Sequence, residues 1–451
     1  MSEIPDTWIN TNLKTVANLV TGNTPSTKSP EYYGGSVPFV KPGDLDSADP
    51  ITVTEQQLTE LGAQQSRLVR AGSTLVSCIG NLGKVGFAGV PLATNQQINS
   101  AEFHREIVDD RYGYYLCKTL KSWMERESSA TTIAILNKGK FGEAPFPLAP
   151  LPEQKRIANK LDTVLTRVDA VNTRLARVAP LLKRFRQSVL SAAVNGGLIT
   201  EASLSSPKNW RSVTLGDLIE DGPKNGLYKP SSAYGAGVRI LRIDSFYDGK
   251  VSDWASLRLL SIDSSELKQF GLMNGDLVIN RVNSIEYLGK CALVEGLQGE
   301  CVFESNMMRF RLSPRLANPR FIRTWLCSEA ARTQIVAKAK HAVNQASINQ
   351  SDVCGLKLQL PPLSEQTEIV RRVETLFAFA DRLEARLAQA QTAATRLTPA
   401  LLAKAFRGEL VPQDPNDEPA AELLRRLQAE RATAPKASAG RGRKAAVRSE
   451  G

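Results

Sequence analysis

The sequence predicts an α/β protein in which two pseudo-repeated mixed α/β domains are separated by two long antiparallel coiled-coil helices. Three observations carry this prediction. The two halves of the 451-residue chain share a motif at an offset of 212 residues. A long heptad pattern of apolar residues follows each copy of the motif. The stretches before the motifs repeat more loosely, as short apolar runs between Gly and Pro turns.

The two predicted α/β domains occupy residues 1–150 and 199–360. Each opens on a tryptophan that is followed five residues later by a leucine, Trp8 in the first domain and Trp210 in the second. Outside such framework points the two domains differ in sequence. The pattern therefore indicates two copies of one fold with divergent surfaces.

A hairpin is predicted in each domain, at Gly72–Gly89 and at Gly275–Glu295, because apolar runs flank a turn rich in Gly and Asn. Both hairpins contain a Gly-Lys step, which supplies Lys84 in the first domain and Lys290 in the second. The turn at Lys84 is not a phosphate-binding P-loop, since the first glycine and the final Ser or Thr of that motif are missing.

The shared motif reads LAPLPEQKRIANKLD at Leu148–Asp162 and LPPLSEQTEIVRRVE at Leu360–Glu374. Both copies begin with prolines and continue in a helical pattern. We expect them to open a central helical spacer at 151–198 and a C-terminal helical spacer at 361–412.

Apolar residues follow alternating four- and three-residue steps through both predicted helices, at ten positions in each. An ordinary helix that faces a domain core is the alternative, but the same ten-step pattern in both copies favours two helices that pack on each other. The seam is predicted at Ile157, Leu161, Val164, Val168, Val171, Leu175, Ile369, Val373, Leu376, Leu383 and Leu387.

Signals for the ends of these helices also repeat. Gly196 and Gly408 stand at matching C-terminal stop positions. Pro180 and Pro399 lie within the helical patterns, where we expect them to kink or split the helices. A short helix is predicted at 413–431, followed by a disordered basic tail at 432–451 that is rich in Ala, Gly and Ser.

The charge balance favours a polyanionic partner. The chain has 57 Lys and Arg against 46 Asp and Glu, which gives a net charge of +11 and a pI of about 9.3. The tail contributes only +4 of this, whereas residues 151–190 contribute +6. A charged stripe on a helix is either a solvated face or a surface for nucleic-acid phosphates or an acidic protein.

Catalytic and metal-binding patterns are missing from the sequence. The six cysteines are scattered and only two histidines occur, so we expect reduced cysteines and no metal site. Dinucleotide, nucleophile-elbow and methyltransferase motifs are not found, and we predict no active site and no cofactor in this chain. No stretch suits a membrane helix or a signal peptide, which indicates a cytoplasmic protein.

Side chains suited to base edges or phosphates occur in the Gly- and Asn-rich turns of both domains. Asn and Gln bond adenine, and Arg and Lys bond guanine, although each of these residues also suits an ordinary turn. The candidates for DNA binding are Asn81, Lys84, Asn137, Lys138, Lys140, Tyr228, Lys229, Arg281, Asn283, Lys290, Asn349 and Gln350.

On these motifs the chain resembles the specificity subunit of type I restriction–modification enzymes. The resemblance rests on the duplicated PLPEQKRI and PLSEQTEI helix starts, on the stretch at Leu182–Leu198, and on AFRGELVPQDPNDEPA at Ala405–Ala420. It spans nearly the whole chain, although the two α/β domains match only in framework. The basic tail is not part of the family pattern.

The resemblance implies two target-recognition domains that read a bipartite, asymmetric site in double-stranded DNA, with the helices setting the gap between half-sites. It also implies two methyltransferase subunits and two restriction and translocase subunits as partners. S-adenosylmethionine, ATP and Mg²⁺ would belong to those partners. A free-standing nuclease or methyltransferase, a coiled-coil scaffold and an RNA-binding protein remain as alternatives.

Overall fold

The computed structural model describes residues 4–47, 49–129, 133–199, 209–251, 253–343 and 345–433. It divides into two compact units, Met1–Arg174 with Gln391–Gly451 (unit 1) and Leu175–Ala390 (unit 2). Two long helices, α6 (Leu151–Val194) and α11 (Leu363–Ala405), each begin in one unit and end in the other.

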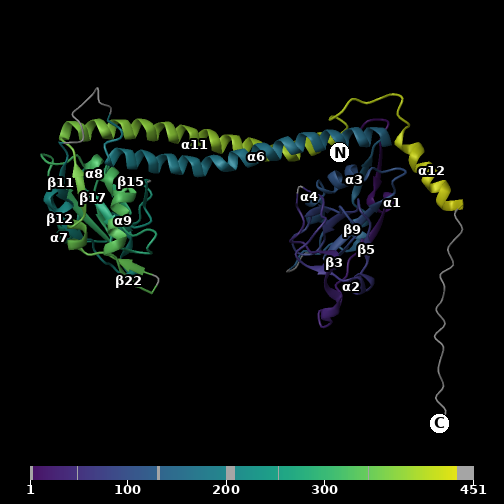
Figure 1. The fold of residues 1–451 in the computed structure, drawn as a ribbon, viewed down its shortest axis with the longest axis horizontal. Coiled ribbons are helices and arrows are strands. Elements are labelled where there is room, and N and C mark those ends of the chain that lie inside the picture. Colours follow the sequence, from purple (N-terminus) through teal and green to yellow (C-terminus); the bar gives the residue numbers. More distant parts are fainter. Residues whose placement is uncertain are drawn as a thin grey trace, which may run out of the picture. The chain divides into compact units, whose positions relative to one another are not determined.

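Unit 1 is built on two four-stranded sheets of order β2-β9-β6-β7 and β4-β3-β8-β5, and strands β1 and β10 pair separately. All neighbouring strands are antiparallel except β3 and β8. Helices α2 and α3 lie at opposite ends of the unit (Figure 1). The strands are β1 (Ile9–Asn12), β2 (Ala17–Thr21), β3 (Tyr33–Val40), β4 (Gln57–Leu58), β5 (Leu68–Val69), β6 (Thr74–Ser77), β7 (Val85–Phe87), β8 (Leu92–Thr94), β9 (Ile98–Phe103) and β10 (Pro145–Leu148); the short helices are α1 (Leu13–Val16), η1 (Pro30–Tyr32), α2 (Glu60–Gln64), α3 (Asp110–Cys117), α4 (Lys121–Glu127) and α5 (Lys138–Gly142).

Unit 2 contains sheets of order β12-β21-β17-β19-β15-β14, β16-β13-β20 and β18-β23-β22, together with the pair β11 and β24. The strands are β11 (Arg211–Thr214), β12 (Ile219–Asn225), β13 (Tyr234–Leu241), β14 (Phe246–Tyr247), β15 (Gly249–Val251), β16 (Leu259–Leu260), β17 (Leu277–Asn280), β18 (Val282–Asn283), β19 (Cys291–Leu293), β20 (Cys301–Phe303), β21 (Met307–Leu312), β22 (Lys340–Ala342), β23 (Gln345–Ser347) and β24 (Lys357–Leu360); the short helices are η3 (Leu215–Leu218), η4 (Ser231–Ala233), α7 (Ser264–Phe270), α8 (Pro319–Leu326), α9 (Glu329–Lys338) and α10 (Gln350–Cys354).

The two predicted hairpins are confirmed. Strands β6 and β7 pair antiparallel, and so do β17 and β19. The central strands β6 and β17 are buried at every position, because one face of the sheet packs on the first helix after the hairpin region and the other face on the second sheet. Each unit thus places a buried strand directly before a loop that carries predicted DNA-binding residues.

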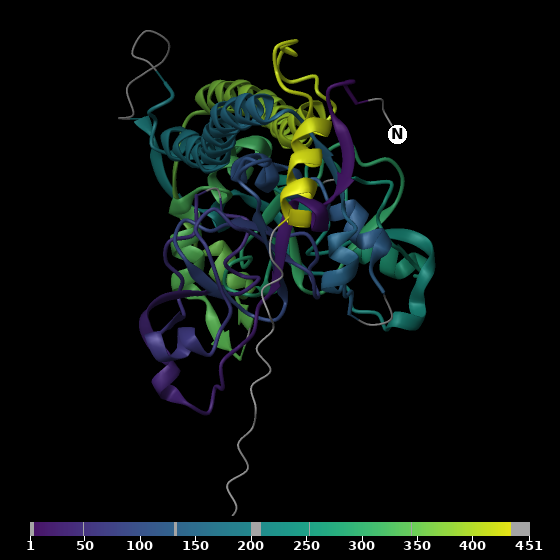
Figure 2. The ribbon, with the colours of Figure 1, turned by 90° about the vertical axis from the view of Figure 1, so that its right-hand side faces the viewer.

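Helices α6 and α11 lie side by side and run antiparallel, as predicted (Figures 1 and 2). In unit 1 the start of α6 shares a hydrophobic cluster with Leu402 near the end of α11. In unit 2 Val189 near the end of α6 shares a cluster with Ile369 near the start of α11. Arg186 also forms ion pairs with Asp381 and Glu384 of α11, at 2.5 and 3.0 Å.

The predicted seam is buried most completely where the helices meet the α/β domains. Ile157, Leu161, Ile369 and Val373 are at most 1% exposed. Val171 departs from the predicted seam, since it is 43% exposed. The heptad pattern alone cannot separate the part of the seam that a domain core also covers from the part that only the other helix covers.

The prolines do not split the helices, which was one of the two outcomes expected for them. Pro180 and Pro399 lie inside α6 and α11, which continue through them. Both prolines are exposed, so water can bond the carbonyl group that loses its helical N–H partner, and the long helix tolerates the loss.

The C-terminal helix α12 spans Ala420–Thr433, and the residues between α11 and α12 form turns. It therefore begins later than the predicted helix at 413–431. The predicted basic tail lies, from residue 434 on, outside the described residues. Among the helices of the described chain, none is long and apolar enough to cross a membrane.

Candidate nucleic-acid interface

In unit 2, a small three-stranded sheet brings several predicted residues together. Asn283 on β18 pairs with Ala346 on β23, which in turn pairs with His341 on β22. The amide of Ile348 donates a 2.9 Å hydrogen bond to the carbonyl of Arg281. The predicted residues Asn349 and Gln350 come directly after Ile348 in the chain and therefore lie near Arg281.

A turn at residues 303–307 brings Tyr228 and Lys229 toward this sheet. The amide of Leu227 bonds the carbonyl of Phe303 at 3.0 Å, and the amide of Arg281 bonds the carbonyl of Asn306 at 2.8 Å. Tyr228 is 80% exposed. The ammonium group of Lys229, in contrast, forms a 2.6 Å ion pair with Glu266, which lowers the pKa of that carboxyl group.

Two of the predicted asparagines have a clear local role. The side-chain oxygen of Asn137 accepts a 2.8 Å hydrogen bond from the amide of Lys140 and caps α5. Asn349 caps α10 in the same way, with a 2.9 Å bond from the amide of Asp352. These positions are 212 residues apart, and helix capping accounts for asparagine at both.

The corresponding region of unit 1 has the same backbone frame. Ile135 forms bridges with Ile79 and Ser129, where unit 2 has its three-stranded sheet. Asn81 is exposed, and its carbonyl accepts a 2.6 Å hydrogen bond from the Ser77 hydroxyl. Asn81 and Lys84 therefore lie in the loop between β6 and β7, which also carries the bridge from Ile79 to Ile135.

The lysines of unit 1 differ in their charge environment. Lys140 forms a 2.6 Å ion pair with Glu127, and Lys84 lies 3.9 Å from the carboxylate of Asp46. Lys138 is exposed at the first position of α5. Exposed ion pairs contribute little to stability, but they reduce the positive charge that a lysine offers to DNA.

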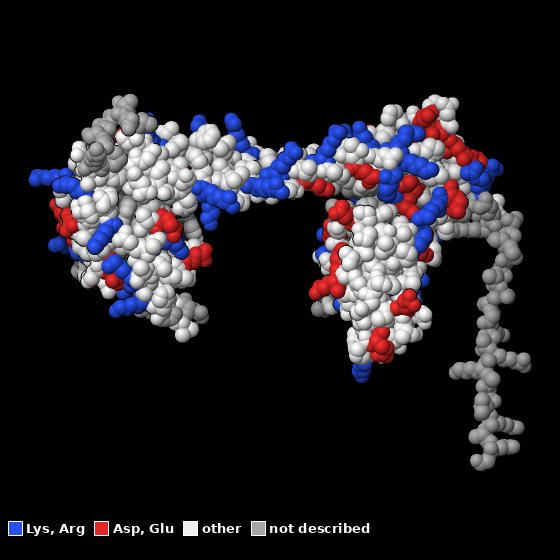
Figure 3. Space-filling view, viewed as in Figure 1, with Lys and Arg blue, Asp and Glu red and all other residues white. Residues whose placement is uncertain are grey.

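Basic side chains also gather along α6, as Figure 3 shows on the helix pair. The exposed basic residues on this helix are Lys155, Lys160, Arg167, Arg174, Arg177, Lys183 and Arg184. Solvent-exposed arginine and lysine on a regular helix suit sequence-independent contact with phosphates.

A duplicated latch joins each α/β domain to its long helix, and it connects two repeats, of tryptophan and of Glu-Gln, that were recognised separately in the sequence. The indole N–H of Trp8 donates a 2.9 Å hydrogen bond to the carboxylate of Glu153, and Trp210 bonds Glu365 at the same distance. Both glutamates are 1% exposed. Burial raises the pKa of Glu153, although the bonds from Trp8 and Gln413 oppose that shift.

The glutamine next to each glutamate completes the latch. The Gln154 side chain accepts a 2.9 Å bond from the amide of Asp109 and donates 2.8 Å bonds to the carbonyls of Ile107 and Ala149. Gln366 repeats this pattern with the amide of Asn318 at 2.7 Å. The Glu-Gln pair recurs in both repeats because it attaches the start of each long helix to its α/β domain.

Unit 1 has an additional strap from the C-terminal part of the chain. The amide of Ala420 bonds the carbonyl of Thr7 at 2.9 Å, and the side chain of Gln413 donates a 2.5 Å bond to Glu153. Arg156 forms a 2.7 Å ion pair with Asp417. The strap (residues 408–420) therefore covers the Trp8 latch.

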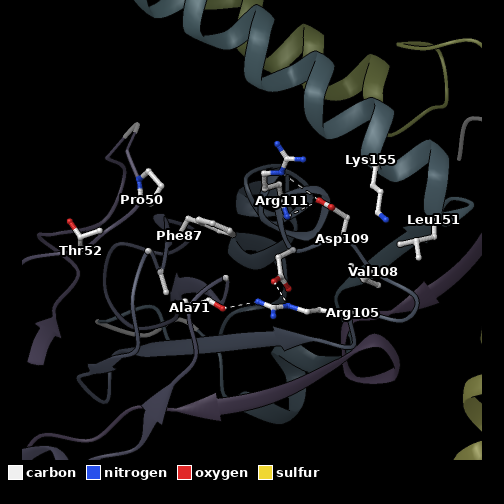
Figure 4. A pocket seen from close by; sticks show the side chains of 14 residues that line it. Pro50, Thr52, Ala71, Phe87, Arg105, Val108, Asp109, Arg111, Leu151 and Lys155 are labelled. Atoms are coloured by element: carbon white, nitrogen blue, oxygen red, sulfur yellow. Dashed lines mark hydrogen bonds and ion pairs between the residues drawn. The ribbon is translucent and has the colours of Figure 1, made fainter.

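A groove of about 750 Å³ lies beside the latch of unit 1 (Figure 4). Its charged groups are largely engaged. Arg105 bonds Asp110 at 2.9 Å, and Arg111 bonds Asp162 of α6 at 2.5 Å. A groove occurs at the same place of unit 2, beside Arg320, which bonds Glu295 and Glu374. In both units, arginines beside the groove thus attach the α/β domain to its long helix.

Within the described residues, no group of three or more His, Cys, Asp or Glu side chains could hold a metal ion. All six cysteines are free thiols.

Comparisons with known proteins agree with the sequence motifs. The model of the type I restriction modification DNA specificity domain matches residues 5–179 and 207–391. The chain is 37% identical over 317 residues to the type I restriction enzyme EcoKI specificity subunit of Escherichia coli strain K12, and the match covers 68% of each protein. It is 30% identical over 459 residues to the EcoBI specificity subunit of Escherichia coli, covering 95% of this chain and 93% of the relative.

Solved structures share the fold. A chain from a study of complex assembly and conformational transition of the type I R-M system has a TM-score of 0.70 at 20% identity, covering 91% of this chain and 100% of that chain. The HsdS subunit from Thermoanaerobacter tengcongensis has a TM-score of 0.58 at 20% identity, covering 90% of this chain and 98% of that chain.

Proposed function

Because the chain belongs to the family of type I restriction–modification DNA specificity subunits, we propose that it reads a bipartite, asymmetric DNA target, with one half-site for each repeat. The observation that supports this proposal is a backbone fold that occurs twice, with loops that differ in sequence. The latches and the hairpins repeat, while the side chains on the loops differ. A shared frame suits two related half-sites, and different loops suit different bases.

The chain delivers this recognition to partner subunits that carry out the chemistry. We propose two methyltransferase subunits and two ATP-dependent restriction and translocase subunits. S-adenosylmethionine, ATP and Mg²⁺ act in those partners. The latch and groove residues described above are occupied by structural bonds, which supports a specificity subunit over a free-standing nuclease or methyltransferase. The family match disfavours a bare scaffold or an RNA-binding protein.

The purified chain is expected neither to cleave nor to methylate DNA, whereas methylation appears once its methyltransferase and S-adenosylmethionine are added. The reason is that the sequence has no motif for either reaction. Incorporation of labelled methyl groups into plasmid DNA measures the result, with the methyltransferase alone as the control. Methyl transfer by the chain alone would contradict the proposal.

Damage to one repeat is expected to alter one half-site only. The variant Asn81→Ala with Lys84→Ala should relax or abolish reading of the first, and Arg281→Ala with Asn283→Ala should affect the second. A lost bidentate base contact costs about 1 to 3 kcal/mol at one position. Sequencing of methylated adenines in the host measures both half-sites. The division of labour is wrong if either variant changes both.

A further inference from the structure

The Gly-Lys step of each hairpin has the same backbone role in both repeats. Gly83 and Gly289 have φ angles of +75° and +74°, which favour glycine. A Cβ atom on Gly83 would lie 2.9 Å from Cα of Lys121 in α4, and one on Gly289 would lie 2.7 Å from Cδ1 of Ile335 in α9. Backbone geometry therefore explains the two glycines, but it does not explain the two lysines.

The lysines have different surroundings. Lys84 faces a carboxylate, that of Asp46, at 3.9 Å. The Nζ atom of Lys290 instead lies 4.1 Å from the ring centre of Tyr247, 4.7 Å from that of Phe246 and 5.7 Å from that of Tyr287. These distances are those of cation–π contacts. Eight residues, Tyr287 among them, lie between β17 and Gly289, against five between β6 and Gly83.

The aromatic rings hold the ammonium group of Lys290 without using its hydrogen-bond donors. Within the described residues, this Nζ atom has no hydrogen bond and no ion pair, and Asp244 and Asp248 act on it only at longer range. Burial lowers the pKa of Lys290. Tyr247 and Tyr287 are 55% and 44% exposed, so the cluster opens to solvent with three N–H donors free.

We propose that Lys290 reads a guanine in the half-site of the second repeat by donating to the O6 and N7 atoms of that base. The inference rests on the proposed function and assigns a base contact within it. A phosphate contact needs only charge, which flexible exposed lysines provide. An ammonium group whose position is fixed by Phe246, Tyr247 and Tyr287 suits a directional pair of acceptors.

The test uses the full-length Lys290→Met variant with its methyltransferase, because methionine keeps an unbranched apolar side chain and removes the charge. Methylated sites in host DNA first give the wild-type motif, and binding is then measured on duplexes with single base-pair changes. We expect discrimination at one G·C pair of the second half-site to fall by about 5- to 140-fold. All other positions should keep their preference.

Several other outcomes would overturn the assignment. Uniform weakening on all duplexes, with a salt slope lower by about one, would show a phosphate contact. An unchanged motif together with unchanged affinity would show that Lys290 makes no contact with DNA. A change in both half-sites would show a structural role. Wild-type protein that directs no methylation would instead refute the proposed function itself.

Matched variants keep the experiment interpretable. Lys84→Met makes the same change at the duplicated step and should leave the second half-site unchanged. Tyr247→Phe keeps the ring and should preserve the guanine preference, whereas Tyr247→Ala should reduce it at the same base pair as Lys290→Met. If Lys290→Met fails to fold, as judged by its thermal unfolding, Lys290→Arg takes its place. Arginine also bonds guanine, so it should retain the preference there, and its loss would contradict the assignment.

Discussion

Replacement of Gln154 by leucine is expected to destabilise unit 1 by about 3 to 5 kcal/mol, since each buried group left without a partner costs about 1 to 3 kcal/mol. The side chain is 0% exposed, and it satisfies the amide of Asp109 and the carbonyls of Ile107 and Ala149. Leucine has a similar size but satisfies none of these groups. The loss would detach the start of α6 from the domain that it supports.

Urea unfolding followed by circular dichroism measures this effect. Gln187 is exposed on the same helix, so Gln187→Leu makes the same chemical change without burying an unsatisfied group. Gln366→Leu should reproduce the destabilisation in unit 2, where the same bond pattern recurs. If Gln154→Leu unfolds at the same urea concentration as Gln187→Leu, the latch does not hold the domain.

Insertion of four residues after Ala170 is expected to lengthen the unspecified spacer of the DNA target by about two base pairs while both half-sites stay the same. Four helical residues add about 6 Å, and one base pair adds about 3.4 Å. Both α6 and α11 belong to both units, so α11 receives a four-residue insertion as well, after Arg396, and the two helices gain the same length.

Sequencing of methylated adenines reads the spacer and the half-sites in one measurement. A variant of unchanged length, in which four exposed residues of α6 become alanines, controls for the disturbance of the helix surface. An active insertion variant that keeps the original spacer would show that the helices do not set the distance between half-sites.

The helix pair could be predicted from the sequence because its apolar residues recur at regular intervals. The 212-residue offset and the heptad steps led to two antiparallel helices with correct starts near Leu151 and Leu363. The expected split at the prolines did not occur, because the energetic cost of a proline in a helix depends on exposure, which periodicity does not report. Val171 was misjudged for a related reason, since its 43% exposure depends on which neighbours cover the seam at that point.

The site was predictable only at the level of loops. Composition pointed to Asn137 and Asn349, yet the structure gives both a capping role. The three lysines Lys84, Lys140 and Lys229 face carboxylates from distant parts of the chain. Such long-range partners leave no trace in local spacing, and the bond from Trp8 to Glu153, 145 residues apart, could not be inferred for the same reason.

The C-terminal residues on either side of the strap have a consequence for biosynthesis. Leu402, Phe406 and Leu423 belong to the core of unit 1, together with Trp8, which precedes β1, and Leu13 of α1. The ribosome synthesises the N-terminal residues long before the C-terminal ones. The core of unit 1 is therefore complete only after almost the whole chain has been translated. Unit 2, which is contiguous in sequence, can fold during that interval. The later half of the chain is thus made before the apolar residues of the earlier half meet Leu402, Phe406 and Leu423, their partners in the core.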